Sequence, residues 1–71
     1  MIYPLFIARR EARMKSKDLA EALHMHPVTY SNKENGKSEF TRSEMLTICR
    51  ILGKSLDELF REEVPHGRPQ S

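Results

Sequence analysis

The sequence predicts an all-α fold in which five short helices pack around a single core. Along most of the 71 residues, apolar side chains recur every three or four positions, which is the spacing of one helix face. Two capping boxes, TRSE at residues 41–44 and SLDE at residues 55–58, mark the starts of helices. No segment alternates apolar and polar residues in the manner of a half-buried strand, so we expect no sheet.

The first two helices are expected to be short. Residues 4–13 form the first helix, because Pro4 suits the first turn and one face carries Leu5, Ala8 and Ala12. The second helix takes Ser16 or Lys15 as its N-cap and ends near His24. Its apolar face is formed by Leu19, Ala20 and Leu23.

Proline and glycine delimit the remaining helices. Residues 27–35 form the third helix, which starts at Pro27 and stops before Gly36. After a loop at residues 37–40, the fourth helix begins in the first capping box and ends at Gly53. Its apolar face is formed by Met45, Ile48, Cys49 and Leu52. The second capping box opens the fifth helix, whose inward residues are Leu56, Leu59 and Phe60.

Length and composition limit the chain to one small domain, residues 1–63, followed by a flexible tail at residues 64–71. Cys49 has no second cysteine to pair with, so helix packing rather than a disulfide must stabilise the fold. No signal peptide or apolar membrane span is found, which predicts a soluble cytoplasmic protein. Residues 1–37 hold seven Lys and Arg against four acids, whereas residues 38–71 hold five against six, so the first half suits a polyanionic partner better.

Residues 16–37 bear most directly on function. Two short helices joined by a tight turn at residues 24–26 fit a helix-turn-helix, in which the small Ala20 lets the helices cross closely. Over about residues 5–60 the chain resembles the Cro/lambda-repressor-like (XRE) family of helix-turn-helix regulators. The resemblance rests on DLA at residues 18–20 followed by Leu23, on ENGK at residues 34–37 and on GKSLDEL at residues 53–59. It implies a five-helix lambda-repressor-like DNA-binding domain.

The resemblance also implies which residues contact DNA. The helix at residues 27–35 would lie in the major groove and read bases through Pro27, Val28, Thr29 and Asn32. Asn32 can bond bidentately to adenine, Thr29 can donate or accept, and Val28 can pack on a thymine methyl. The expected phosphate contacts are Ser16, Lys17, Asn35 and Lys37. Lys15 and Lys33 would add non-specific attraction.

Arg9 and Glu34 match a pair that joins the first helix to the third by a salt bridge in the family, so the resemblance implies a structural role for both. The chain also departs from the family at four positions. The family usually has glutamine at Ser16, an apolar residue at Lys33, and glycine at Arg13 and His24. The last two residues are therefore expected to take positive φ.

These observations predict a sequence-specific DNA-binding transcriptional regulator, a repressor of phage or prokaryote type. One helix reads few base pairs, so we expect a homodimer on a palindromic operator in double-stranded DNA. The dimer surface is expected around Leu56, Phe60 and Val64. Two alternatives on the same fold are a protein-interaction module, such as an antirepressor or antitoxin-like partner, and an architectural protein that binds DNA without sequence preference.

Enzymatic and metal-dependent functions are not predicted. No nucleophile has an acid or base partner at a motif spacing, and no cofactor, membrane or small-molecule substrate is implied. His24 and His26 beside the lone Cys49 fall short of the four ligands that a structural zinc site needs.

Overall fold

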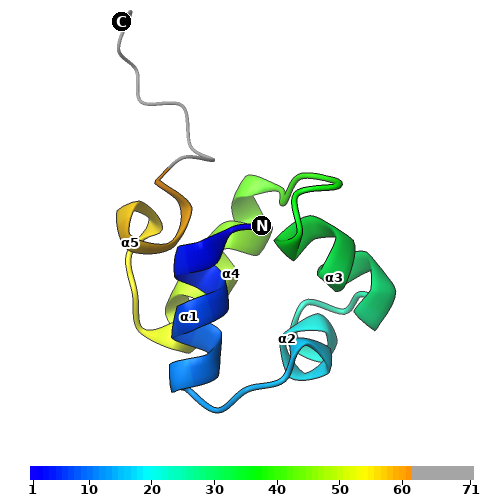
Figure 1. Ribbon diagram of the computed structural model, residues 1–71, viewed down its shortest axis with the longest axis horizontal. Coiled ribbons are helices and arrows are strands. Elements are labelled where there is room, and N and C mark those ends of the chain that lie inside the picture. The colour runs from blue at the N-terminus through cyan, green and yellow to red at the C-terminus, as the bar shows by residue number, and fades with distance from the viewer. Residues whose placement is uncertain (62–71) are drawn as a thin grey trace, which may run out of the picture.

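The structure, a computed structural model, describes residues 1–61, and this part of the chain holds five α-helices and no strand (Figure 1). Their bounds are α1 Tyr3–Glu11, α2 Ser16–Ala22, α3 Pro27–Glu34, α4 Arg42–Leu52 and α5 Leu56–Phe60. The predicted all-α fold is confirmed. The tail expected at residues 64–71 lies outside the described residues.

Side-chain caps define the starts of α4 and α5, as the sequence predicts. Thr41 Oγ1 accepts from the Glu44 N–H at 3.1 Å, and the Glu44 carboxylate accepts from the Thr41 N–H at 2.9 Å. Ser55 and Glu58 repeat this exchange at 3.0 and 2.8 Å. Between these caps, α4 ends at Gly53, whose φ of +67° costs glycine little. The placement of both helices therefore follows from signals within a few residues of their ends.

The first two helices are shorter than predicted. α1 ends at Glu11 rather than at residue 13, and α2 ends at Ala22 rather than near residue 24. Beyond each helix a non-glycine residue is left-handed, Arg13 with φ +59° and His24 with φ +58°, so the helix cannot continue through it. The predicted positive φ at these two residues is confirmed. Ala12 lies beyond the end of α1 and is exposed, so it does not belong to the core face.

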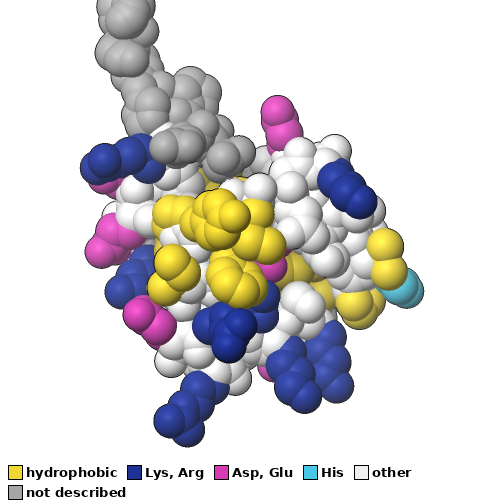
Figure 2. Space-filling view, in the orientation of Figure 1, with side chains coloured by type: hydrophobic (Ala, Val, Ile, Leu, Met, Phe, Trp, Pro, Cys, Tyr) yellow, Lys and Arg dark blue, Asp and Glu magenta, His cyan; other side chains and the backbone are white. Residues whose placement is uncertain are grey.

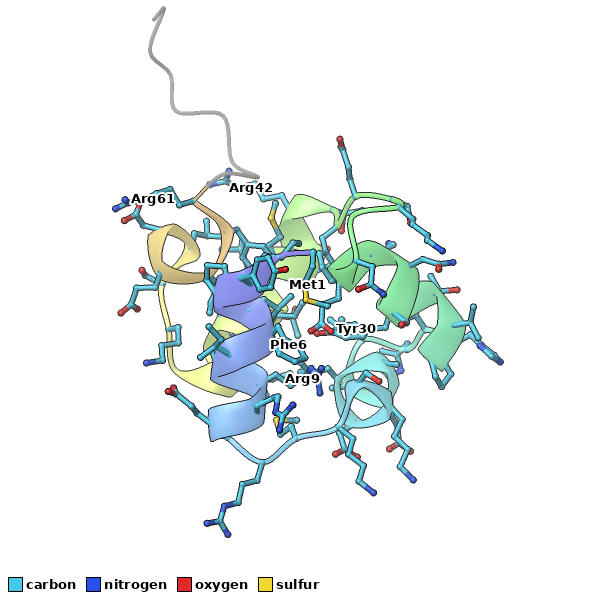
Figure 3. All side chains as sticks on the ribbon, in the orientation of Figure 1. Met1, Phe6, Arg9, Tyr30, Arg42 and Arg61 are labelled. Atoms are coloured by element: carbon cyan, nitrogen blue, oxygen red, sulfur yellow. The ribbon has the colours of Figure 1, made fainter. Side chains whose placement is uncertain are left out.

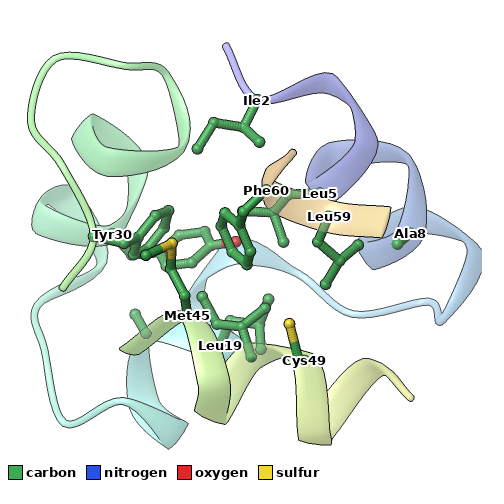
Figure 4. Close-up of a cluster of buried hydrophobic side chains, with 12 residues drawn as sticks. Ile2, Leu5, Ala8, Leu19, Tyr30, Met45, Cys49, Leu59 and Phe60 are labelled. Atoms are coloured by element: carbon green, nitrogen blue, oxygen red, sulfur yellow. The ribbon is translucent and has the colours of Figure 1, made fainter. Parts of the chain in front are cut away.

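The core lies where all five helices meet in the described chain (Figure 4). Its largest fully buried side chains are Leu5, Leu19, Tyr30, Ile48, Leu59 and Phe60. Phe40, from the loop after α3, joins the two halves of this core: its ring centroid lies 5.6 Å from that of Tyr30 and 5.7 Å from that of Phe60. Such tilted and edge-on ring pairs stabilise beyond the area that they bury.

The helices form two groups around this core. α5 contacts both α1 and α4, while α2 contacts α3 on the other side of the molecule (Figure 1). The two groups meet through the core and through the first residues of the chain, because the Ile2 N–H donates to the Glu34 carbonyl at 2.9 Å. The end of α3 is thus tied to the start of α1.

The expected dimer surface on α5 is wrong in one respect. Phe60 is fully buried in the core and cannot contact a second molecule, and Val64 lies outside the described residues. Exposed apolar side chains instead gather on α1 and just before it, where Met1, Tyr3 and Ile7 are each about half exposed or more (Figure 2). A groove of about 410 Å³ separates this α1 surface from α5.

Candidate nucleic-acid interface

α2 and α3 form a compact two-helix unit joined by a four-residue turn. The Met25 N–H donates to the Ala20 carbonyl at 2.9 Å, and His24 within the turn takes a left-handed φ of +58°. Ala20 is fully buried. A larger side chain there would push the two helices apart, because packed interiors leave no room for extra atoms. This is the geometry of a helix-turn-helix.

The two faces of α3 differ sharply in their surroundings. Tyr30 and Glu34, one helical turn apart, point inward and are 0% and 4% exposed. The residues at the start of α3 are exposed, and Val28 reaches 60%. Single exposed apolar residues are ordinary, but a valine this open at the first turn of an anchored helix can meet a partner without any rearrangement. The base-reading residues expected from the resemblance, Pro27, Val28 and Thr29, lie on this exposed end, and Asn32 is half-buried one turn further on.

Glu34 anchors α3 to α1 through a largely buried ion pair. Arg9 Nε and Nη2 donate to the two Glu34 carboxylate oxygens at 3.0 and 3.1 Å, and the Tyr30 hydroxyl donates to Glu34 Oε2 at 2.9 Å. Arg9 Nη1 also donates to the Met14 carbonyl at 2.9 Å, which holds the turn between α1 and α2. Figure 3 shows Arg9 and Tyr30 in the space between α1 and the α2–α3 unit. The pair that the resemblance implies is thus bidentate in the structure, and it involves no exposed atom of the α3 reading end.

The surroundings of Arg9 and Tyr30 keep the arginine charged and the tyrosine hydroxyl protonated. Burial disfavours the charged form of Arg9, but the hydrogen bonds and charge of Glu34 outweigh it and raise the pKa of Arg9. Burial, and then the Glu34 carboxylate, raise the pKa of Tyr30, so its hydroxyl stays protonated and remains a donor. The carboxylate therefore has three donors and is satisfied while buried.

Lys33 has a different role from the one expected. Its ammonium forms a salt bridge with Glu44 Oε1 at 2.8 Å, and its side chain is only 14% exposed. The nitrogen also lies 6.0 Å from the centre of the Phe40 ring. Because the charge is paired and mostly buried, Lys33 is poorly placed for non-specific attraction to DNA. It instead links α3 to the N-terminus of α4, where Glu44 is part of the Thr41 cap.

The residues expected to hold phosphates lie at the start of α2 and the end of α3. Ser16 is half-buried and Lys17 is exposed, and the N-cap of α2 is Lys15, whose N–H donates to the Asp18 carboxylate at 2.8 Å. Because lysine has no acceptor atom, this is a one-sided cap, and the alternative of Ser16 as N-cap is wrong. Asn35 and Lys37 are exposed on either side of Gly36, which has φ +88°.

Further basic side chains lie beside the start of α2. A cleft of about 390 Å³ is lined by Phe6, Arg9, Arg10, Arg13, Met14, Lys15 and Ser16. The guanidinium carbons of Arg9 and Arg10 both lie 5.5 Å from the centre of the Phe6 ring. Arg10 and Arg13 are exposed, so basic side chains extend from the start of α2 to the end of α1 and the residues just beyond it (Figure 2).

His26 caps α3, a role that the sequence pattern does not reveal. From the sequence it is the residue before Pro27 in a turn, whereas in the structure it is the N-cap of α3. Its ring nitrogen Nδ1 accepts from the Val28 N–H at 3.1 Å. The available signal is the position directly before a helix-starting proline, but serine, threonine, aspartate and asparagine are the usual caps there.

Within residues 1–61 no group of three or more His, Cys, Asp or Glu side chains is placed to hold a metal ion. No helix in the same range is long and apolar enough to cross a membrane.

Comparison with known proteins identifies a family. A model of the family described as helix-turn-helix matches residues 6–59, which include all of α2, α3 and α4 and the residues that carry the resemblance noted above. Neither a curated protein nor a solved structure matches the chain.

Proposed function

This chain belongs to the helix-turn-helix family of Cro- and lambda-repressor-like (XRE) DNA-binding transcription regulators, and from that premise we propose that it is a sequence-specific repressor. The proposal is that α3 lies in the major groove with its first turn toward the base edges. One observation carries it: α3 is held from behind by the buried Tyr30 and Glu34, while Val28 at its free end is 60% exposed. An anchored helix with an open first turn is what major-groove reading requires.

The proposed base contacts follow from side-chain chemistry at the exposed end. Val28 packs on a thymine methyl, Thr29 donates to or accepts from a base edge, and Pro27 adds apolar contact. Asn32 is the residue best suited to pair with adenine through two hydrogen bonds. Because it is half-buried, its reach depends on how closely α3 approaches the groove floor.

The proposed phosphate contacts are at the two ends of the α2–α3 unit. Ser16 and Lys17 meet the backbone from the start of α2, and Asn35 and Lys37 meet it from the end of α3. Such contacts set the register of α3 on the duplex without reading its sequence. Lys33 is left out of this set because its ammonium is held by Glu44.

We also propose that the protein acts as a homodimer on a palindromic operator. A single α3 reads too few base pairs for useful specificity, so two copies on half-sites about one helical turn apart are needed. We propose that the second copy covers the exposed Met1, Tyr3 and Ile7 of the α1 surface, rather than the exposed Leu46 and Ile51 of α4. Occupying a promoter in this way blocks transcription.

The experiment that tests the proposal is selection of bound duplexes from a random DNA library at two salt concentrations. We expect a palindrome with half-site centres about one turn apart. Asn32→Ala should weaken binding to it by about 1–3 kcal/mol and relax the preference at one position of each half-site. Retention without a motif would support architectural binding, and no retention at either salt would support a protein-interaction module.

A matched pair of variants separates phosphate contacts from general charge. Lys37→Ala should lower the slope of log affinity against log salt by about one unit per half-site. Arg50→Ala removes the same charge from an exposed position in the last turn of α4 and should leave the slope unchanged. Equal slopes for the two variants would contradict the assignment of Lys37.

A further inference from the structure

We propose that His26 is a positioning residue whose neutral imidazole fixes the reading end of α3, so that discrimination between DNA sequences falls when His26 is protonated. The inference rests on the proposed function for its effect on DNA. Its structural half concerns the protein alone and can be tested without DNA.

The geometry joins His26 to α3 at two points. Its Nδ1 accepts from the Val28 N–H at 3.1 Å, and its carbonyl accepts from the Tyr30 N–H at 3.0 Å. Pro27, between them, has no N–H to satisfy. The imidazole thus takes the first free backbone donor of the helix, and that donor belongs to Val28, a proposed base-reading residue that is 60% exposed.

Accepting this hydrogen bond fixes the protonation of the ring. Nδ1 must carry a lone pair, so the proton of the neutral imidazole is on Nε2. A protonated ring carries N–H on both nitrogens and cannot accept from Val28. It would also put a positive charge at the positive end of the helix dipole. Protonation therefore removes the acceptor for the Val28 N–H, and the charged ring is repelled by the positive end of the α3 dipole.

The other side-chain caps of the described helices do not share this property. α4 and α5 are capped by the hydroxyls of Thr41 and Ser55, which keep their acceptors at any pH near neutrality. Histidine alone among side chains normally changes charge between about pH 5 and 8. Of these three helices, only α3, the proposed DNA-reading helix, is capped by an imidazole.

The elements that adjoin His26 carry these charged or titratable groups: Lys17, Asp18 and Glu21 on α2, the exposed His24 in the turn, and Lys33 and Glu34 on α3. The latter two are engaged with Glu44 and Arg9. In the described part of the chain, the hydrogen bond of the His26 ring is to Val28 alone.

Acidification should affect specific and non-specific binding in opposite directions. Loss of the cap loosens the first turn of α3, which weakens contacts that depend on the position of Val28 and Thr29. The imidazolium charge meanwhile strengthens attraction to any duplex. The ratio of the two affinities is therefore the quantity that responds.

The test compares affinity for the selected operator with affinity for a scrambled duplex of the same length, at pH 7.5 and pH 5.5. For the unmodified chain we expect the ratio to fall by about fivefold, the size of a lost N-cap. His26→Ser and His26→Asn provide caps that do not titrate and should keep the ratio constant. His24→Asn removes the neighbouring histidine and should behave as the unmodified chain does.

A second measurement needs no DNA. In the free protein, the chemical shift of the Val28 amide should change between pH 7.5 and pH 5.5, and in His26→Ser it should stay constant. The chemical shifts of the capped amides of Glu44 and Glu58 should stay constant over this range in both proteins. An equal fall of the ratio in His26→Ser, or a Val28 amide that ignores pH, would overturn the inference. Absence of any sequence preference at pH 7.5 would refute the proposed function and, with it, the effect on discrimination. The pH dependence of the Val28 amide would still show whether protonation of His26 breaks the cap.

Discussion

Replacing Arg9 should expose how strongly α3 depends on its buried anchor. In Arg9→Ala the Glu34 carboxylate keeps one of its three donors, the Tyr30 hydroxyl, and stays in a site where the residue is 4% exposed. The Arg9 and Glu34 side chains are 12% and 6% exposed, so solvent screens the pair little. Removing one partner of a buried pair costs about 3–5 kcal/mol, because an uncompensated charge remains. A domain of this size has only about 4–11 kcal/mol of stability in total.

The assay is urea unfolding followed by the helical circular dichroism signal at pH 7, with Arg10→Ala as the matched control. Both arginines have their guanidinium carbon 5.5 Å from the Phe6 ring centre, but only Arg9 pairs with Glu34. We therefore expect Arg10→Ala to cost less than about 1 kcal/mol. Arg9→Lys keeps the charge but loses the two-pronged geometry and should fall between them.

A double substitution distinguishes an unpaired charge from lost packing. Glu34→Gln removes the charge while leaving an amide oxygen that can accept from Tyr30. The double variant Arg9→Ala/Glu34→Gln should therefore lose about 1–3 kcal/mol less unfolding free energy than the sum of the losses in the two single variants. If Arg9→Ala cost no more than Arg10→Ala, or if the two changes were additive, the ion pair would not anchor α3.

Three further predictions concern other parts of the fold. Burial opposes ionisation of Glu44, but hydrogen bonds from Lys33 and the Thr41 N–H outweigh burial and lower the pKa of Glu44. The carboxylate therefore stabilises the fold fully above its unfolded pKa. This stabilisation is lost as the pH falls through the folded pKa. Lys33→Met should accordingly lose less stability than the unmodified chain between about pH 5 and 3, as measured by urea unfolding at each pH. His24→Gly relieves a left-handed residue at the cost of some chain entropy and should raise the free energy of unfolding by about 0.5–1 kcal/mol; a lower melting temperature would contradict this. Burial, followed by the charge of Glu58, raises the pKa of Cys49, so at pH 8 a thiol reagent should label the folded chain at least about tenfold more slowly than the unfolded chain, and equal rates would show that this core face opens readily.

The parts of the fold that depend only on residues close together in the chain can be predicted from the sequence. The caps at Thr41 and Ser55 and the helix ends next to Gly36 and Gly53 each need only a few adjacent residues, and all four are found where predicted. α1 and α2 end earlier than their apolar spacing predicts, because each is followed by a left-handed residue that is not glycine. The Met14 and Met25 N–H groups donate back to the Arg9 and Ala20 carbonyls at these ends, and without a glycine the composition gives no stop signal there.

The same difference between local and long-range contacts holds for the candidate site. The partnership of Arg9 and Glu34, 25 residues apart, came from the family resemblance, since no spacing rule links them. Lys33 pairs with Glu44 across the loop before α4, so its sequence position alone suggested an ordinary exposed lysine. The cap from His26 depends on the orientation of one ring, which no pattern encodes. The base and phosphate contacts stay predictions until a complex is measured.

The opposite faces of α3 have consequences for changing what the protein recognises. Tyr30 and Glu34 supply the attachment to the core, while Val28 and Thr29 make no contact on which the core depends. Exposed positions of this kind usually accept substitution within about 0.5 kcal/mol. If α3 reads DNA as proposed, new sequence preferences can be selected by randomising positions 28 and 29 while the rest of the domain is left unchanged.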